Sequence, residues 1–358
     1  MHLIRSSEDL NKERNTAMSE KNILEMDHVS FSFHTYGGIV KAVRDVSFQV
    51  REGEILGIVG ESGCGKSVTA QCILKLNPEG VGFFEGGSIK YKGEEIVTKS
   101  DREMRKIRGK EIGFIFQDPM TSLNPTMRIG NQIEEIFLGR TDLSKKDRKE
   151  AILDILEKVG ITDPERRLKQ YPHELSGGMK QRIGIAMALI GKPSIIIADE
   201  PTTSLDVTIE AQILTLLKSL CKTMKVSVII ITHDLGVIAK VCDRVMVMYG
   251  GKVVENGLVD DIFYKKGHPY TRGLLQSIAR LDMKKEDKLL SIEGTPPDLF
   301  APPKGCPFAV RCEYAMEICY EQMPAKTEFT EEHFSYCWLQ HPNAPKAREI
   351  YQQNREGE

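Results

Sequence analysis

Eight residues, GESGCGKS at 60–67, have the types and spacing of a phosphate-binding loop. They follow the apolar run EILGIVG (54–60) and precede the helical pattern SVTAQCILKL. Glycines at this spacing let backbone N–H groups surround a phosphate, Lys66 adds a positive charge, and Ser67 offers a hydroxyl to Mg²⁺. The dipole of the following helix favours the same anion. We therefore expect this loop to bind the phosphates of a nucleotide together with Mg²⁺.

Two adjacent carboxylates at the end of another apolar run supply the second half of the chemistry. The stretch SIIIADE places Asp199 at the carboxyl end of a predicted strand, where it can hold Mg²⁺ directly or through water. Glu200 would then lie beside the γ-phosphate and polarise the attacking water. Adjacent acids could also belong to a solvated loop, but a phosphate loop whose Ser67 ligates a metal needs such an acid.

Hydrophobic periodicity predicts that an α/β fold positions these residues. Helical patterns separate the strand-like runs, as at 207–225. Strands that alternate with helices indicate an α/β fold with a mainly parallel central sheet. The predicted strands lie at 23–33, 42–50, 54–60, 193–200, 226–234 and 243–257.

The middle of the chain, about 120–190, is predicted to be an α-helical insertion into this fold. The stretch LSKKDRKEAILDILEKVGI carries a capping box, formed by Ser144 with Asp147, and Gly160 closes the helix. Its apolar positions recur at helical spacing and predict one buried face. These positions are Ile152, Ile155, Leu156 and Val159.

Composition and charge narrow the classes of protein that the chain can represent. The 358 residues carry a formal net charge of −2, whereas nucleic acid as the main partner usually goes with a basic stripe. The longest apolar runs fall far short of the roughly 18 residues that span a bilayer. The first twenty residues lack the apolar segment of a secretory signal. We expect a cytoplasmic protein with a flexible tail at 1–22, whose translation starts at Met1 or at Met18.

Three further motifs appear together with the phosphate loop and the paired acids. They are LSGGMKQR (175–182), FIFQDP (114–119) and ITHD (231–234). With them, the chain resembles the ATP-binding subunits of ABC transporters over about residues 23–262. The resemblance implies a P-loop ABC-type nucleotide-binding domain, with a RecA-like core and an inserted α-helical subdomain, that hydrolyses ATP.

The same resemblance implies roles for individual residues. Glu200, His233 and Gln117 would be catalytic, with His233 touching the γ-phosphate and Gln117 touching Mg²⁺ and the attacking water. The metal would be held by Ser67, Gln117 and Asp199. Nucleotide binding is implied for Tyr36, Gly60, Glu61, Ser62, Gly63, Cys64, Gly65, Lys66, Ser67, Val68, Gln117, Ser176, Gly177, Gly178, Asp199 and Asp206.

Some of these residues would act across a dimer interface. In a head-to-tail dimer of ATPase subunits, Ser176, Gly177 and Gly178 of one subunit would cap the ATP that the other subunit holds. Asp206, in the SLD motif, would lie in the loop that crosses the interface. Tyr36 matches the aromatic residue that stacks on adenine, although a core aromatic residue is the alternative for this position.

Three stretches resemble one branch of the ABC transporters, the dipeptide and oligopeptide permeases, whose relatives also import nickel chelates and some sugars. They are QDPMTSLNP (117–125), GHPYTRGLL (267–275) and GCPFAVRC (305–312), although the second could be an ordinary amphipathic helix start. The resemblance implies a second ATPase subunit, two transmembrane permease subunits and an external peptide-binding protein. The chain would then work at the cytoplasmic face of the membrane as a peripheral subunit. An ABC ATPase that acts on DNA or ribosomes is the alternative, but it would need a second ATPase domain or long coiled coils.

Four of the eight cysteines cluster in a Pro-rich C-terminal module, expected at 263–358, with the spacing C-x₅-C-x₆-C-x₁₇-C. Four thiolates in a cytosolic module with a thin core suggest a metal centre that stabilises the fold. Zinc sites commonly use C-x₂₋₄-C pairs, which this stretch lacks, and so we expect a [4Fe–4S] cluster, as the resemblance also implies. Zinc, or cysteines packed in a core without a metal, are the alternatives. The expected ligands are Cys306, Cys312, Cys319 and Cys337.

Two histidines, His333 and His341, flank Cys337 and could replace a thiolate in a zinc site. We expect both to be surface histidines instead. The purpose of the cysteine module is open between a structural staple, which we favour, and a redox sensor that gates transport.

Overall fold

The computed structural model describes residues 21–78, 80–118, 122–138, 143–203, 206–277 and 292–344. These residues form two compact units whose segments interleave along the chain. Unit 1 contains the described residues of 21–24, 50–55 and 96–231, and unit 2 contains those of 25–49, 56–95 and 232–344. The expected tail at 1–22 lies outside the described residues, except for Lys21 and Asn22.

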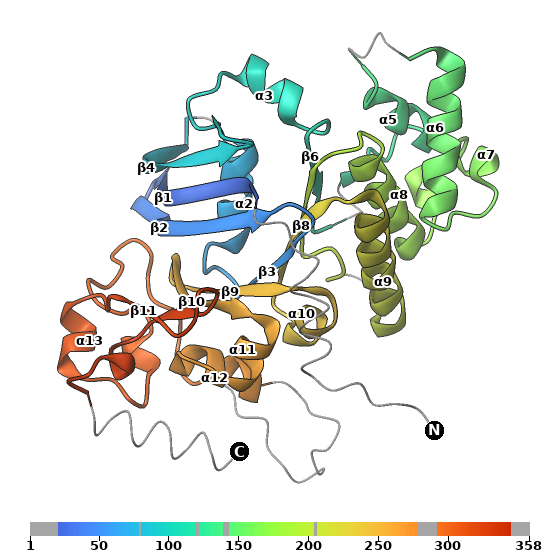
Figure 1. Cartoon of the computed structure of the whole chain (residues 1–358). Coiled ribbons are helices and arrows are strands. Elements are labelled where there is room, and N and C mark those ends of the chain that lie inside the picture. The colour runs from blue at the N-terminus through green and yellow to red at the C-terminus, as the bar shows by residue number, and fades with distance from the viewer. Residues whose placement is uncertain are drawn as a thin grey trace, which may run out of the picture. The chain divides into compact units, whose positions relative to one another are not determined.

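Unit 1 is built on three parallel strands in the order β6-β7-β8 (Figure 1). All residues of β7 and β8 are buried, and apolar runs without alternation are typical of parallel strands covered on both faces. The carboxyl ends of the three strands therefore lie at one edge of the sheet. The strands are β6 (Ile112–Ile115), β7 (Ile195–Asp199) and β8 (Ser227–Thr232).

The helices of unit 1 include a group within the predicted helical insertion, in which α6 packs against α7 and α8 (Figure 1). The predicted capping box is confirmed, because the Ser144 side chain accepts from the Asp147 N–H and the reciprocal bond is present. The predicted apolar stripe of α6 is also buried. The helices are α3 (Asp101–Ile107), α5 (Ile129–Glu135), α6 (Lys145–Lys158), α7 (Pro164–Arg167), the short 3₁₀ helix Pro172–Glu174, α8 (Gly177–Leu189) and α9 (Val207–Met224).

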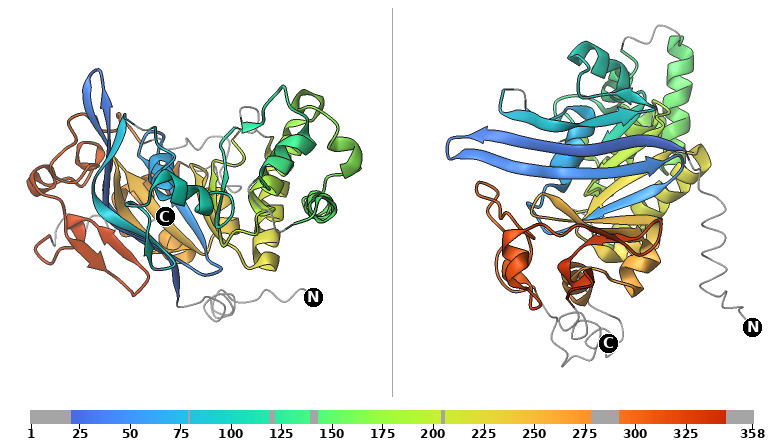
Figure 2. Two further views of the ribbon diagram at one scale, coloured as in Figure 1. Left: turned by 90° about the horizontal axis from the view of Figure 1, so that it is seen from above. Right: turned by 60° about the vertical axis from the view of Figure 1, so that its left-hand side comes forward.

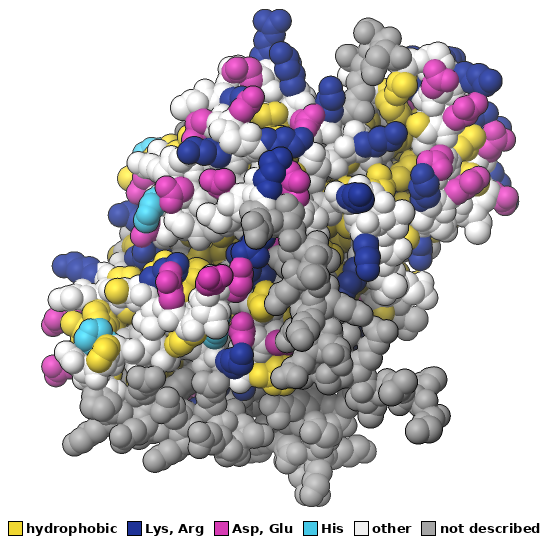
Figure 3. Space-filling view, in the orientation of Figure 1, with side chains coloured by type: hydrophobic (Ala, Val, Ile, Leu, Met, Phe, Trp, Pro, Cys, Tyr) yellow, Lys and Arg dark blue, Asp and Glu magenta, His cyan; other side chains and the backbone are white. Residues whose placement is uncertain are grey.

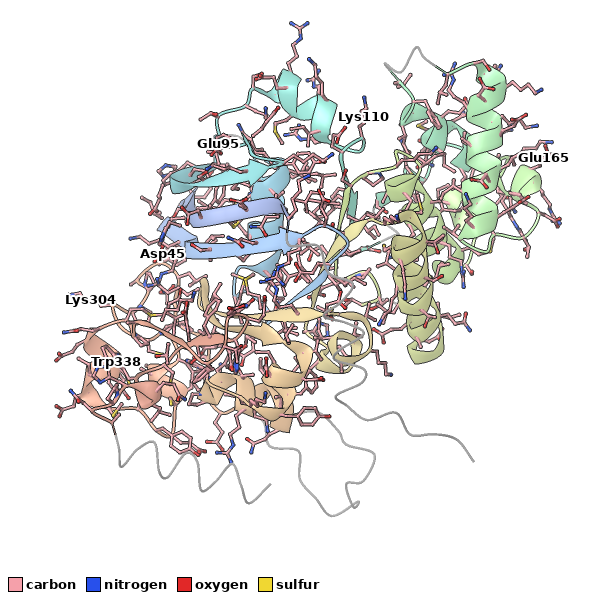
Figure 4. The ribbon with its side chains drawn as sticks, viewed as in Figure 1. Asp45, Glu95, Lys110, Glu165, Lys304 and Trp338 are labelled. Carbon is pink, nitrogen blue, oxygen red and sulfur yellow. The ribbon has the colours of Figure 1, made fainter. Side chains whose placement is uncertain are left out.

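Charged side chains of both signs alternate on the exposed surface of α6 and α7 (Figure 3). Lys158 pairs with Asp154 at 2.6 Å within α6, and Lys149 pairs with Glu165 of α7 at 2.8 Å (Figure 4). Exposed pairs of this kind stabilise a fold only slightly. A surface of mixed sign differs from the single-sign stripe of a nucleic-acid-binding face.

Unit 2 contains a four-stranded sheet in the order β2-β1-β4-β5, which the sequence did not distinguish from the central sheet. Its first two strands form a long twisted ribbon (Figure 2). Asp45 of β2 bridges to β1, where its carboxylate lies 2.6 Å from His28 Nδ1 (Figure 4). The strands are β1 (Asn22–Thr35), β2 (Gly38–Arg51), β4 (Gly82–Tyr91) and β5 (Glu94–Glu95).

A second sheet of unit 2 has the order β11-β12-β10-β9-β3. β3 and β9 are parallel, as predicted, and the remaining pairs are antiparallel. The single predicted run at 243–257 is in fact two strands, because Gly250 and Gly251 both have positive φ angles and turn the chain between them. The strands are β3 (Ile55–Val59), β9 (Arg244–Tyr249), β10 (Lys252–Leu258), β11 (Lys326–Glu328) and β12 (Phe334–Tyr336).

The helices of unit 2 come mostly from the C-terminal half of the chain. They are α2 (Lys66–Leu74), α10 (Leu235–Val241), α11 (Val259–Tyr264), α12 (Pro269–Gln276), α13 (Glu317–Glu321) and the short 3₁₀ helices Ala309–Arg311 and Trp338–Gln340. The predicted boundary between 262 and 263 stays a prediction, and the described residues on both sides of it lie in unit 2. Within the described ranges, every helix is too short or too polar to cross a membrane.

Candidate active site

The predicted phosphate-binding loop joins β3 to α2 in unit 2. Gly60, Gly63 and Gly65 have φ angles of 153°, 78° and 98°, which residues with side chains rarely adopt. A Cβ atom at Gly60 would lie 2.2 Å from the carbonyl oxygen of Met248. A Cβ atom at Gly65 would lie 2.4 Å from that of Ala42. Only glycine fits at these two positions, and the chain can therefore turn tightly before α2.

The loop is shaped to receive an anion. α2 begins at Lys66 with Gly65 as its N-cap, and no side chain caps this helix start. The first N–H groups of a helix lack intrahelical acceptors and can donate to phosphate oxygens. A Cβ atom at Gly63 would meet no atom within 4 Å, and so the loop is open on that side. The hydroxyl of Ser67, which is partly exposed, adds an oxygen ligand of the kind that Mg²⁺ prefers.

The side chain of Lys66 is folded back on its own loop. It is 5% exposed, and its Nζ donates to the carbonyl oxygens of Gly60 at 2.7 Å and Glu61 at 2.9 Å. The thiol of Cys64 is buried beside it, and burial raises the pKa of that thiol. The ammonium group thus lies within the loop that would surround the phosphates.

The two predicted acids and the predicted glutamine come together in unit 1. Asp199 ends β7 and is 5% exposed, and Glu200 follows it with a φ angle of 44°. A non-glycine residue with positive φ is strained, and such strain is often found at functional sites. Gln117 follows β6, which is the parallel neighbour of β7. The carboxyl ends of β6 and β7 therefore lie at the same edge of the sheet, where Gln117 Nε2 donates to Glu200 Oε2 at 2.8 Å.

Ser176, Gly177 and Gly178 form the start of α8 in unit 1. The Ser176 Oγ accepts from the N–H of Met179 at 3.3 Å, and Ser176 is thus the N-cap of the helix. Ser176 and Gly177 are exposed. A second helix start with exposed donors is therefore present, as the sequence predicts, and it can face an anion from outside the unit.

Three further predicted residues are exposed. Asp206 lies before α9 in unit 1, where its Oδ1 accepts from the Ile209 N–H at 3.0 Å. Tyr36 lies in unit 2 between β1 and β2 and has a relative exposure of 115%, which rules out the alternative of a core aromatic residue. His233 directly follows β8 and is exposed.

Sequence reasoning missed three residues that contact the predicted site. Thr203 Oγ1 donates to Glu200 Oε2 at 2.9 Å in unit 1. In unit 2, Tyr270 Oη accepts from the N–H of Glu61 at 2.8 Å, and Arg311 donates to the Glu61 carboxylate at 2.7 Å. Tyr270 lies in GHPYTRGLL and Arg311 in GCPFAVRC, motifs whose importance the sequence signalled without assigning these side chains a role.

The predicted [4Fe–4S] cluster is wrong. Among the described residues, which include all four cysteines, no group of three or more His, Cys, Asp or Glu side chains could hold a metal ion, and this also removes the zinc alternative. Burial raises the pKa of Cys306 to about 11 and that of Cys312 to about 12, and neighbouring thiols add to both shifts. Cys337 packs in a small apolar cluster with Leu339, Tyr314 and Met316, in agreement with the alternative of cysteines packed in a core.

The expectation that His333 is a surface histidine is also wrong. His333 is 1% exposed, and its Nε2 lies 2.9 Å from Oε1 of Glu255, which is fully buried. Glu255 also accepts from the backbone N–H groups of Gly267 and His268. A buried carboxylate needs such partners, and they come from parts of the sequence too distant to be paired by pattern. His341 is exposed, as expected.

Comparison with known proteins gives the family. Residues 43–203 match the family described as ABC transporter, and residues 254–319 match the C-terminal region of oligopeptide/dipeptide transporters. The chain is 55% identical over 324 residues to the oligopeptide transport ATP-binding protein OppD of Bacillus subtilis, with 90% of each chain covered. The chain belongs to the oligopeptide and dipeptide transport ATP-binding proteins of the ABC family. Membership makes it an ABC ATPase, whose ligands are ATP and Mg²⁺.

Other relatives of this ABC ATPase agree. It is 54% identical to the dipeptide transport ATP-binding protein DppD of Bacillus subtilis. The aligned residues cover 91% of this chain and 97% of the relative. Among solved structures, the ATP-binding cassette MJ0796, a dimer in a post-hydrolysis state bound to ADP and Pi, is similar with a TM-score of 0.59. That structure is 29% identical and covers 66% of this chain and 98% of its own. The ABC ATPase cassette fold predicted from the motifs is therefore confirmed.

Proposed function

We propose that this ABC ATPase energises the import of dipeptides or oligopeptides through a membrane transporter. The observation that carries the proposal is the identity of 54–55% to peptide-transport ATP-binding proteins over about nine-tenths of the chain. The match of residues 254–319 to the C-terminal region of oligopeptide/dipeptide transporters supports the same substrate class.

The chemistry that we propose uses the residues of the nucleotide-binding motifs. The loop at 60–67 binds the phosphates of ATP, and the Lys66 ammonium moves from its carbonyl acceptors to phosphate oxygens, which carry full negative charge. Ser67, Asp199 and Gln117 supply oxygen ligands to Mg²⁺, which offsets the charge of the phosphates.

The proposed catalytic base is Glu200, which takes a proton from the water that attacks the γ-phosphate. Gln117 and Thr203 both donate to Oε2 of this carboxylate and thereby fix its orientation. His233 contacts the γ-phosphate and Tyr36 stacks on the adenine ring, for which its full exposure leaves it available.

We propose that two ATPase subunits act as a head-to-tail dimer, in which Ser176, Gly177 and Gly178 of one subunit cap the ATP of the other and Asp206 lies at the interface. The dimeric state of the similar cassette MJ0796 supports this arrangement. The remaining proposed partners are two transmembrane permease subunits and an external peptide-binding protein, with the ATPase at the cytoplasmic face of the membrane.

The proposed division of the chain has an ATPase domain at 23–262, with a helical subdomain at about 120–190, and a C-terminal extension at 263–358. The separate family matches at 43–203 and 254–319 support this division. Nucleic acid has no part in the proposed function.

Deletion of the gene and measurement of labelled peptide uptake test the proposal. The deletion strain should lose uptake of a dipeptide or an oligopeptide and retain uptake of free amino acids. The wild-type chain should restore peptide uptake, whereas Glu200→Gln should not, because it lacks the base. Unchanged peptide uptake in the deletion strain would contradict the proposed substrate class.

A further inference from the structure

Glu61, the second residue of the phosphate-binding loop, is held through its backbone N–H, its carbonyl and its carboxylate. The N–H donates to Tyr270 Oη at 2.8 Å, and the carbonyl accepts from Lys66 Nζ at 2.9 Å. The carboxylate Oε2 accepts from Arg311 at 2.7 Å. All four residues lie in unit 2. Glu61 therefore links the lysine of the loop to two residues of the C-terminal part of the chain.

The guanidinium of Arg311 is fixed by further bonds. Its side chain is 5% exposed, and the nitrogen that contacts Glu61 also donates to Tyr249 Oη at 3.0 Å. Its Nε donates to the carbonyl of Glu293 and its remaining nitrogen to that of Ile292, both at 2.8 Å. The planar, five-donor group of arginine suits such a site, whereas lysine could not make these bonds together.

The hydroxyl of Tyr270 is fixed by packing. Tyr270 is fully buried on α12, and its ring centroid lies 4.5 Å from that of Tyr249 and 5.2 Å from that of Phe308. The N-cap of α12 is His268, whose Nδ1 accepts from the Tyr270 N–H at 3.1 Å. Phe308 belongs to the same CPFAVRC stretch as Arg311. The two residues that hold Glu61, Tyr270 and Arg311, are therefore held by one packed cluster.

We infer that Arg311 and Tyr270 are positioning residues of the ATP site, which hold Glu61 and the phosphate-binding loop in the conformation that receives the triphosphate. The inference rests on the proposed function, because it takes this loop to be where ATP binds. Neither residue touches the nucleotide in this account. Both residues act before ATP binds. They hold the loop in its binding-competent conformation, and the free energy of ATP binding is therefore not spent on ordering the loop.

The charge of Glu61 gives Arg311 a second effect on ATP affinity. An unpaired carboxylate on a loop that binds a polyanion would repel that polyanion. Arg311 pairs with this carboxylate and offsets its charge. Loss of Arg311 should therefore weaken ATP binding through Glu61, while the step at Glu200 is left intact.

A double-mutant cycle on the full-length chain tests this coupling. Arg311→Gln should raise the Kd for ATP by about tenfold or more, the range expected when a hydrogen bond between charged groups is lost. In a Glu61→Gln background the same substitution should raise the Kd by much less, because no unpaired carboxylate remains. An equal rise in both backgrounds would mean that Arg311 only joins parts of the fold, and would overturn the inference.

A second variant keeps the test decisive if Arg311→Gln fails to fold. Tyr270→Phe removes only the hydroxyl that accepts from the Glu61 N–H, and should raise the Kd for ATP by about threefold to tenfold with little change in kcat. A matched control is Arg272→Gln, since Arg272 donates to the hydroxyl of Tyr314 at 2.8 Å in the same unit. The control should leave the Kd within about twofold of wild type.

The outcomes separate the inference from the proposed function. Wild-type affinity in Tyr270→Phe, or an equal loss in Tyr270→Phe and Arg272→Gln, would overturn the inference and leave the ATPase assignment intact. A wild-type chain that binds no ATP would overturn both.

Discussion

At the scale of single residues, the orientation of the Glu200 carboxylate is the feature on which the proposed mechanism of hydrolysis depends. Two donors, Gln117 Nε2 and Thr203 Oγ1, converge on the same carboxylate oxygen at 2.8 Å and 2.9 Å. The backbone of Glu200 is held at a positive φ angle, so the residue reaches this position at an energetic cost. A base that is held in this way does not have to be oriented again in each catalytic cycle.

Substitution of the glutamine tests this orientation. Gln117→Ala should lower kcat for ATP hydrolysis by about 10-fold to 100-fold, because misorientation of a catalytic group has effects of this size. The Kd for ATP in the presence of Mg²⁺ should rise by a smaller factor than kcat falls, because Gln117 is only one of the proposed Mg²⁺ ligands and the loop at 60–67 is untouched. Thr203→Ser, which keeps the hydroxyl, is the control and should retain most of kcat. Steady-state hydrolysis with separate binding measurements decides, and a loss confined to binding would contradict the account.

At the scale of elements, the start of α12 depends on a buried neutral histidine. His268 is 1% exposed and caps the helix through Nδ1, while its Nε2 lies 4.0 Å from Cys306 Sγ. Burial lowers its pKa to about 3, from an ordinary value near 6.5. Protonation would place a charge in an apolar setting and remove the acceptor for the helix cap. The titratable groups nearby are the Cys306 thiol, His333 and the carboxylate of Glu255, which accepts from the His268 backbone N–H.

The lowered pKa predicts acid destabilisation with a defined sign. His268 binds a proton less readily in the folded chain than in the unfolded chain. The contribution of neutral His268 to the free energy of unfolding is therefore complete above pH 6.5 and is lost as the pH falls toward 3. The slope should be about 1.4 kcal/mol per pH unit between these values. His268→Asn keeps a capping side chain and should flatten the dependence. Urea unfolding at a series of pH values measures it.

The matched control for this prediction is His341→Asn, since His341 is exposed. It should leave the dependence on pH as in the wild type. An unchanged slope in His268→Asn would mean that another group carries the acid sensitivity.

The elements that the sequence predicted best have a strong local signal. α6 was found from its capping box and apolar stripe, and β7 and β8 from apolar runs that parallel burial requires. The separate four-stranded sheet was missed, because alternation in 23–33 and 42–50 shows strands but not which partners they pair with. The contacts of Arg311 and Tyr270 with Glu61 join positions about 200 residues or more apart, and no local pattern reports them.

The cysteines show the limit of spacing as a guide. From the sequence alone, four cysteines in a module whose core looks thin favour a metal centre. In the structure, Cys306, Cys319 and Cys337 are buried among side chains of unit 2, which also contains the phosphate loop. The module has neighbours that the sequence could not reveal, and its core is less thin than its composition indicates.

At the scale of the whole molecule, the account requires two subunits for one complete site. Ser176 caps the start of α8, and both Ser176 and Gly177 are exposed in the isolated chain. Glu200→Gln should bind ATP without hydrolysing it and thereby accumulate the dimer, either with itself or with the second ATPase subunit. Light scattering with and without ATP should show a rise to twice the mass of the wild-type monomer. A chain that stays monomeric with both candidate partners would contradict the dimeric site.

The most direct test of the central claim is peptide transport coupled to ATP hydrolysis. The ATPase subunits and the two permease subunits would be reconstituted in vesicles with the peptide-binding protein, and labelled peptide uptake and phosphate release would be measured together. The account predicts that peptide stimulates hydrolysis and accumulates only with ATP, and that Glu200→Gln in this chain lowers both. Peptide accumulation that continues at the wild-type rate with Glu200→Gln, or hydrolysis that never responds to peptide, would contradict it.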